Sequence, residues 1–97
     1  MLYINENLQT FDLDAALASI SEQRREQALR FKHEQGRREC VAAYLLLRDA
    51  LSREFGIDEN PVFEYDAGGK PRLKGHHGIY FNLSHCREAA VCVVDTV

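Results

Sequence analysis

The side chains best suited to chemistry in this sequence lie between Tyr80 and His85, which reads Tyr-Phe-Asn-Leu-Ser-His. We expect a short strand that ends in a polar tip. A hydroxyl, an imidazole and backbone N–H groups at a strand end suit a bound phosphate. The same residues suit an ordinary turn, in which Asn82 and Ser84 satisfy local backbone groups. Taken alone, the segment favours the turn.

The neighbouring Ser84 and His85 do not form a convincing nucleophile and base. Adjacent side chains of an extended chain point to opposite faces, so the two could not easily hydrogen-bond to each other. The sequence has no Gly-x-Ser-x-Gly motif, and no acid can be assigned to a triad. Hydrolase chemistry at Ser84 is therefore disfavoured.

A second candidate is the turn Gly69-Lys70-Pro71. Its lysine could present a point charge to a phosphate or to an adenine edge. The turn is not a Walker loop, because the spaced glycines and the Ser or Thr after the lysine are missing. Most turns of this composition are simply turns.

Basic residues are concentrated early in the chain, where a short segment holds half of the twelve lysines and arginines: Arg24, Arg25, Arg30, Lys32, Arg37 and Arg38. Such a cluster could supply bidentate donors to an anion. Four glutamates are interleaved with it, so on its own the segment is more typical of a solvated helix face.

Composition excludes several classes of protein. The net charge of −3 does not predict a nucleic acid or an anionic membrane as partner. The three cysteines show no Cys-x-x-Cys spacing, which fits a reducing cytoplasm better than a disulfide scaffold. We see no signal peptide and no apolar run long enough to span a bilayer. His76-His77 lacks a third metal ligand and reads as an exposed turn.

Three helices are expected in the first half. A short one around residues 15–18 has Asp12 or Asp14 as its cap, and Ser21 caps a second that we expect to end at about residue 33 or 35. The longest runs from Arg37 to Phe55, ahead of Gly56, with apolar residues spaced three or four apart: Cys40, Tyr44, Leu47, Leu51 and Phe55.

The second half changes to an alternating pattern. We expect strands at residues 62–65, 79–83 and 89–94, a short extended piece at 72–74, and an edge strand at 2–4. Turns fall at residues 66–71 and 75–78. The fold class is α+β, with a long helix packed on a small antiparallel sheet of about three strands.

Three segments occur in a characteristic order: Ser21 to Glu26, then Gly69-Lys70-Pro71, then Phe81 to His85. In this arrangement the chain resembles the N-terminal lobe of the two-lobed 4'-phosphopantetheinyl transferases, the type that activates nonribosomal peptide and polyketide synthetases. The resemblance covers nearly all of residues 1–97, which we interpret as a single domain. Each motif is weak alone, and together they are fairly specific.

The resemblance implies a function. Members transfer phosphopantetheine from coenzyme A to a serine of an acyl or peptidyl carrier protein, with a divalent metal such as Mg²⁺. Each lobe is one half of a pseudo-two-fold fold, and coenzyme A lies in the cleft between the lobes. By motif position, coenzyme A-binding roles fall on Arg24, Arg38 (or Arg37), Gly69, Lys70, Pro71, Asn82, Ser84 and His85.

The chain also departs from the family pattern. Cys86-Arg87 replaces the usual Ser-Gly, and Gln27 replaces a usual basic residue. The metal-binding Gly-x-Asp-x-Glu motif would follow within about ten residues of the last strand, but the sequence ends at Val97. We therefore expect no catalytic residue and no metal ligand within this chain, and no transfer activity from the chain alone.

Two expectations follow. An apolar face that would meet the second lobe should be exposed, and a homodimer could cover it in place of that lobe. The rival interpretation is a non-catalytic anion-binding or protein-interaction domain that keeps the motifs as structure only. Coenzyme A binding that depends on Lys70 and His85 separates the two.

Overall fold

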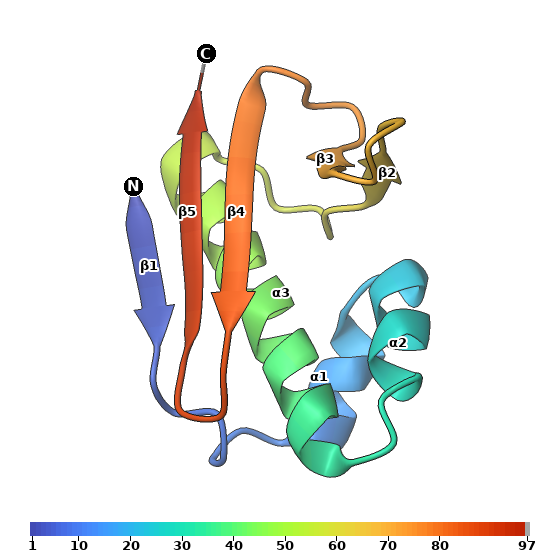
Figure 1. The fold of residues 1–97 in the computed structure, drawn as a ribbon. Helices are drawn as coiled ribbons and strands as arrows, with labels where there is room; N and C mark the ends of the chain where they lie inside the picture. The colour runs from blue at the N-terminus through green and yellow to red at the C-terminus, as the bar shows by residue number, and fades with distance from the viewer. Residues whose placement is uncertain (97) are drawn as a thin grey trace.

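The computed structural model describes residues 1–96 (Figure 1). Three helices lie behind a three-stranded sheet, and a two-stranded ribbon lies beside it. In chain order the elements are β1 (Leu2–Asn5), α1 (Leu13–Ser19), α2 (Glu22–Leu29), α3 (Glu34–Phe55), β2 (Phe63–Tyr65), β3 (Pro71–Leu73), β4 (Ile79–His85) and β5 (Ala90–Thr96).

The main sheet has the strand order β1-β5-β4 and is antiparallel throughout. The first strand therefore pairs with the last, with Leu2 opposite Val93. On the other side of β5, Phe81 lies opposite Val94 and His85 lies opposite Ala90. The predicted α+β class, with a long helix on a small antiparallel sheet, is confirmed.

The core lies between α3 and one face of this sheet. Tyr44, Leu47 and Leu51 of α3 are fully buried against Cys92 and Val94 of β5. Fully burying one large apolar side chain is worth about 1.5–3 kcal/mol, so the stripe contributes several kcal/mol to stability. The helix ends as predicted at Gly56, whose φ of +66° is readily adopted by glycine.

The boundary between the second and third helices differs from the prediction. Ser21 caps α2 as expected, accepting from Arg24 N at 3.1 Å, but α2 ends at Leu29 rather than at residue 33 or 35. Helix α3 then begins at Glu34 rather than at Arg37. Gly36 therefore lies inside α3. A glycine is needed there because the ring of Phe31 packs against it, and a Cβ at this position would lie 2.7 Å from Cδ1 of Phe31.

The strands also differ at their ends. Strand β4 continues beyond the predicted residue 83 to His85, and β5 runs from Ala90 to Thr96 rather than over 89–94. Ser84 and His85 are thus paired within the sheet, opposite Val91 and Ala90, instead of forming a tip beyond it. Both residues belong to the sheet because the pairing of β4 with β5 continues as far as His85 and Ala90.

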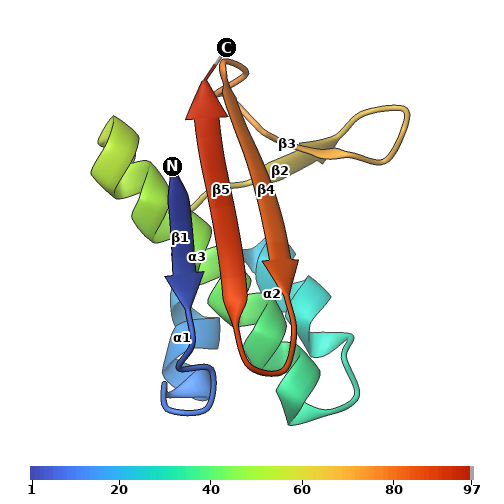
Figure 2. The same cartoon turned by 60° about the vertical axis from the view of Figure 1, so that its left-hand side comes forward.

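The second face of the main sheet is uncovered, and in Figure 2 it lies in front of the three helices. Its exposed apolar side chains come from all three strands: Leu2 (59% exposed), Ile4 (54%), Tyr80 (42%) and Val93 (41%). We call these four residues the open-face patch. No helix within residues 1–96 combines the length and the apolarity needed to cross a bilayer. The predicted cytoplasmic location stays a prediction.

Candidate anion-binding site

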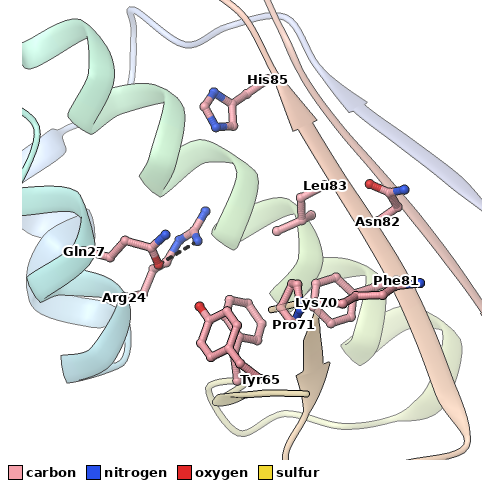
Figure 3. A pocket seen from close by; sticks show the side chains of 10 residues that line it. Arg24, Gln27, Tyr65, Lys70, Pro71, Phe81, Asn82, Leu83 and His85 are labelled. Atoms are coloured by element: carbon pink, nitrogen blue, oxygen red, sulfur yellow. Dashed lines mark hydrogen bonds between the residues drawn. The ribbon is translucent and has the colours of Figure 1, made fainter. Parts of the chain in front are cut away.

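A cavity of about 400 Å³ lies between α2, the β2–β3 ribbon and β4 (Figure 3). Three of its lining residues are basic or can become so, namely Arg24, Lys70 and His85, and within the described chain no Asp or Glu lines it. The full lining is Arg24, Gln27, Phe63, Tyr65, Lys70, Pro71, Phe81, Asn82, Leu83 and His85. Its positive charge and its aromatic content suit an anion attached to a flat, apolar group.

Strand β4 forms one wall of the cavity, with alternate side chains on the cavity side of the strand. In Figure 3, Phe81 and Leu83 lie on the side of the strand that faces α2, and Asn82 lies on the opposite side. The Phe81 ring stacks on the Phe63 ring of β2, with centroids 5.2 Å apart and an interplanar angle of 21°. These stacked rings give the cavity an apolar floor that joins β4 to the ribbon.

Gln23 joins α2 to the ribbon. Its Nε2 donates to the carbonyl oxygen of Phe63, and the N–H of Phe63 donates to its Oε1, each at 2.9 Å. The amide thus pairs with β2 much as a neighbouring strand would. This reciprocal pair sets the distance between the two walls of the cavity.

Asp66 orders the turn that carries Lys70. Its Oδ1 accepts from the N–H groups of Gly68 (2.9 Å) and Lys70 (3.0 Å). Gly69 adopts a φ of +79°, which the turn needs and which glycine tolerates. The N–H of Lys70, with help from Gly68 and Arg72, holds the pKa of Asp66 below its ordinary value of 3.8. The carboxylate therefore fixes the backbone from which Lys70 extends.

Arg24 is a charged cavity residue and is only 7% exposed. Its Nε and Nη2 donate to the carbonyl oxygen of Cys40, at 3.3 and 3.0 Å, and its Nη1 donates to Oε1 of Gln27 at 3.1 Å. Its Cζ lies 5.8 Å from the Phe63 ring centroid. All these partners are neutral, so an anion in the cavity would supply the opposite charge.

His85 closes the far end of the cavity. Its Nδ1 lies 2.9 Å from Oε1 of Glu39 in α3. The hydrogen bond with His85 is the main reason that the pKa of Glu39 is held below its ordinary value of 4.5. Glu39 is therefore a carboxylate at neutral pH, and it contacts the cavity only through the histidine.

Five of the eight predicted site residues line the cavity, and three do not. Arg24, Lys70, Pro71 and His85 line it, as does Asn82, whose side chain nevertheless lies on the side of β4 opposite to Phe81 and Leu83. Ser84 lies on the open face, and Gly69 shapes the turn behind Lys70. Arg38 lies away from the cavity, where its Nη1 donates to the carbonyl oxygens of Phe11 (2.8 Å) and Leu8 (3.2 Å).

Arg37, the alternative to Arg38, is also engaged elsewhere. Its Nε donates to the carbonyl oxygen of Phe31 at 2.9 Å, across the link between α2 and α3. Both arginines therefore tie local backbone together in this structure. Neither is assembled with the residues of the cavity.

Several cavity residues were not among the predicted binding residues, although Phe81 and Leu83 belong to the predicted motif. Phe81 and Leu83 carried a usable signal, because they alternate with Asn82 and Ser84. Phe63 and Tyr65 alternate in the same way, on β2. Glu39 gave no comparable signal, since it is 46 positions from His85 and looks like one more glutamate among basic residues.

Other reactive groups lie outside the cavity. His76 pairs with Glu59 and His77 with Glu64, both on the surface. Across residues 1–96 no three His, Cys, Asp or Glu side chains converge as metal ligands. The cysteines in the same residues are free thiols, two of them buried.

Comparison with known proteins gives consistent results. A family model described as "4'-phosphopantetheinyl transferase, N-terminal" matches residues 8–96. The chain is 28% identical over 96 residues to a 4'-phosphopantetheinyl transferase of Bacillus subtilis, covering 98% of this chain and 43% of that protein. It is 36% identical over 91 residues to the 4'-phosphopantetheinyl transferase HetI of Nostoc sp., covering 90% of this chain and 37% of the relative. The chain thus spans less than half the length of these relatives.

A solved structure has the same fold. It is a holo-(acyl-carrier-protein) synthase from Bacillus anthracis in complex with CoA (3',5'-ADP). The TM-score is 0.68 at 24% sequence identity, and the match covers 96% of this chain and 90% of that one. A chain of about this size can therefore carry the same arrangement of helix and sheet.

Proposed function

Because this chain belongs to the 4'-phosphopantetheinyl transferase N-terminal family, we propose that it is the coenzyme A-binding lobe of such a transferase. The complete enzyme would move phosphopantetheine from coenzyme A to a serine of a carrier protein. The cavity between α2, the ribbon and β4 would hold the nucleotide end of coenzyme A.

The observation that carries this proposal is the composition of the cavity. Arg24, Lys70 and His85 converge on it from three different elements, and among its described lining residues there is no carboxylate. Several phosphate oxygens could be bound there by charge-assisted hydrogen bonds. The solved B. anthracis synthase was crystallised with a ligand of this chemistry, CoA (3',5'-ADP).

The apolar part of the cavity fits the rest of the nucleotide. Tyr65 and Pro71 present flat, apolar surfaces in the same cavity as Lys70. An adenine ring can stack on such surfaces while the lysine meets its phosphates. Binding and orientation of coenzyme A are thus the contributions we assign to this chain.

We assign the chemical step to the remainder of the enzyme. When bound, Mg²⁺ would neutralise negative charge on the pyrophosphate linkage of coenzyme A, which is cleaved as 3',5'-ADP leaves. The described residues provide no three-ligand cluster for the ion. We therefore expect the isolated chain to bind coenzyme A and to transfer nothing to a carrier protein. Formation of holo-carrier by the purified chain, at a rate abolished by His85→Ala, would contradict this.

We propose further that the open-face patch is covered by a second copy of the chain when no second lobe is attached. Leu2, Ile4, Tyr80 and Val93 are all at least 41% exposed and lie together on one face. A patch contributed by three paired strands is flat and rigid, and it suits a two-fold contact. Light scattering should show a concentration-dependent dimer, which Val93→Asp should dissociate. A monomer at every concentration would contradict this.

Calorimetry with coenzyme A tests the binding proposal. We expect saturable binding that Lys70→Ala and His85→Ala each weaken by about tenfold, the value of one charge-assisted contact. Lys74→Ala is the matched control, because Lys74 flanks the other end of β3 and does not line the cavity. Binding that is equally sensitive to all three changes would reflect net charge alone. Absence of binding would favour the rival interaction-domain interpretation.

A further inference from the structure

The pairing of His85 with Glu39 is held in place from behind. Oε1 of Glu39 lies 2.9 Å from Nδ1 of His85, and Oε2 accepts from Nε2 of Gln35 at 3.1 Å. Oε1 of Gln35 in turn accepts from Nε2 of Gln9 at 2.6 Å. Both carboxylate oxygens are therefore occupied, and the carboxylate has little freedom to rotate away from the ring.

This geometry determines which nitrogen of His85 carries hydrogen. An ionised carboxylate can only accept hydrogen bonds, so the hydrogen in the 2.9 Å contact sits on Nδ1. The lowered pKa of Glu39 keeps that carboxylate ionised through the neutral range. A neutral His85 ring consequently has a bare Nε2, which can only accept. Among the described residues Nε2 has no hydrogen-bond partner.

We propose that Glu39 is a positioning residue that makes phosphate binding at the cavity depend on protonated His85. With Nδ1–H held by Glu39, the neutral ring offers a phosphate only an acceptor lone pair. The imidazolium offers an Nε2–H donor together with a positive charge. The inference rests on the proposed function, because it assumes that the cavity takes a phosphorylated ligand.

The charges around His85 make ligand and proton mutually dependent. Glu39 of α3 contacts His85, Arg24 of α2 and Lys70 of the ribbon turn line the same cavity, and the charge of Arg87 in the β4–β5 loop helps to lower the pKa of Glu39. A bound phosphate adds negative charge among these cations. It therefore favours protonation of His85, and protonation favours the phosphate to the same extent. Affinity should fall as the pH rises through the range in which imidazoles lose their proton.

The tautomer can be tested without any ligand. In ¹⁵N-edited NMR of the histidine side chains, neutral His85 should be the Nδ1–H form, which is detected through its two ring-nitrogen shifts. Glu39→Gln should release this preference, because an amide can donate as well as accept. Glu34→Gln is the matched control, since Glu34 lies in the same helix and pairs with Arg38 instead. An Nε2–H tautomer in the unmodified chain would overturn the inference.

The dependence on pH is tested by calorimetry with coenzyme A. Between about pH 6 and about pH 8.5, we expect the unmodified chain to lose about tenfold more of its affinity for coenzyme A than the Glu39→Gln variant loses. The phosphates of coenzyme A titrate equally in both titrations, so the difference between them reports His85. In buffers of different ionisation enthalpy, the unmodified chain should take up a larger fraction of a proton than the variant.

The possible failures can be told apart. Coenzyme A that binds with the same pH slope to both chains overturns the role of Glu39 and leaves the proposed function standing. Coenzyme A that does not bind at all overturns the proposed function and this inference with it. Loss of binding in Glu39→Gln at every pH, with an unchanged slope in whatever binding remains, would assign Glu39 a purely structural role and would also overturn the inference.

Discussion

The two faces of the main sheet differ in what they contribute, although they share the same three strands. On the covered face, Phe81 and Leu83 pack toward α3, and His85 reaches the cavity. On the open face, Tyr80 and Ser84 point away from every helix. Residues that are neighbours in the sequence are thus separated by the thickness of the sheet. Stability and the candidate site belong to the covered face, and the open face remains available for association.

This difference shows that a motif in a strand cannot be read as a block. The run from Phe81 to His85 invites the interpretation that all its polar residues serve one ligand. Because β4 extends through His85, the alternation of the strand assigns Ser84 and His85 to opposite faces. Whether a side chain can meet a ligand in the cavity depends on which face of the strand it occupies, and only alternate residues share a face.

The largest expected effect comes from placing a charge on each face in turn. Val94→Asp puts an unpaired carboxylate in the core and should cost about 3–5 kcal/mol in the free energy of unfolding, enough to unfold much of a small domain. In dilute solution, where the chain is monomeric, Val93→Asp carries the same loss of strand propensity on the open face and should cost about 1 kcal/mol or less. Urea denaturation of both variants makes the comparison. Equal destabilisation would mean that the open face is also packed.

Thiol reactivity should show the same division. Burial raises the pKa of Cys92 to about 11 and also raises that of Cys40, whereas Cys86 is exposed. One thiol per chain should react quickly with a disulfide reagent, and the two buried thiols should react at least about 100-fold more slowly, because they require opening of the core. All three should react in denaturant. Rapid reaction of all three in the native state would contradict the covered core.

Much of the fold was predictable because its signals are local. The Ser21 cap, the apolar stripe of α3 and Gly56 at its end each depend on residues within one or two helical turns. The break between α2 and α3 was misplaced for a tertiary reason. The predicted boundary fell next to Gly36, but this glycine lies within α3 and leaves room for the ring of Phe31. Close packing of this kind leaves no periodic mark in the sequence.

The site was predictable in its motifs but not in its geometry. The resemblance to a known family picked out Lys70 and His85, which do line the cavity. It also picked out Arg38, whose guanidinium instead binds the backbone of Leu8 and Phe11. The contacts that shape the cavity join distant residues, such as Gln23 with Phe63. Only the folded chain brings such partners together.

A smaller effect is expected from removing a polar side chain from each face of β4 in turn. His85→Ala removes a group that lines the cavity and should weaken binding of 3',5'-ADP by about tenfold. Ser84→Ala removes a hydroxyl from the open face and should weaken it by no more than about twofold. Both dissociation constants can be measured by calorimetry. A larger loss for Ser84→Ala would show that the ligand reaches around the strand, and the division between faces would fail for the site.

The smallest effect concerns the wall opposite β4, where Asp66 holds the turn of Lys70. Because its pKa is lowered in the folded chain, its stabilising contribution is complete above the ordinary value of 3.8 and is lost as the pH falls through the folded value. As the pH falls below about 3.8, the amides of Gly68 and Lys70 should lose protection against solvent exchange, relative to an unstructured peptide at the same pH. Asp66→Asn keeps an acceptor and should abolish this change. Unaltered exchange in the unmodified chain would show that another group holds the turn.

The cavity between α2, the ribbon and β4 is where we propose that the nucleotide of coenzyme A binds. The most direct test is to titrate the ¹⁵N-labelled chain with 3',5'-ADP and map the backbone amide shifts. We predict saturable shifts at Lys70 and at Phe81, Leu83 and His85, with little change on β1 at Leu2 and Ile4. Shifts centred on the open face, or none at millimolar ligand, would contradict the claim.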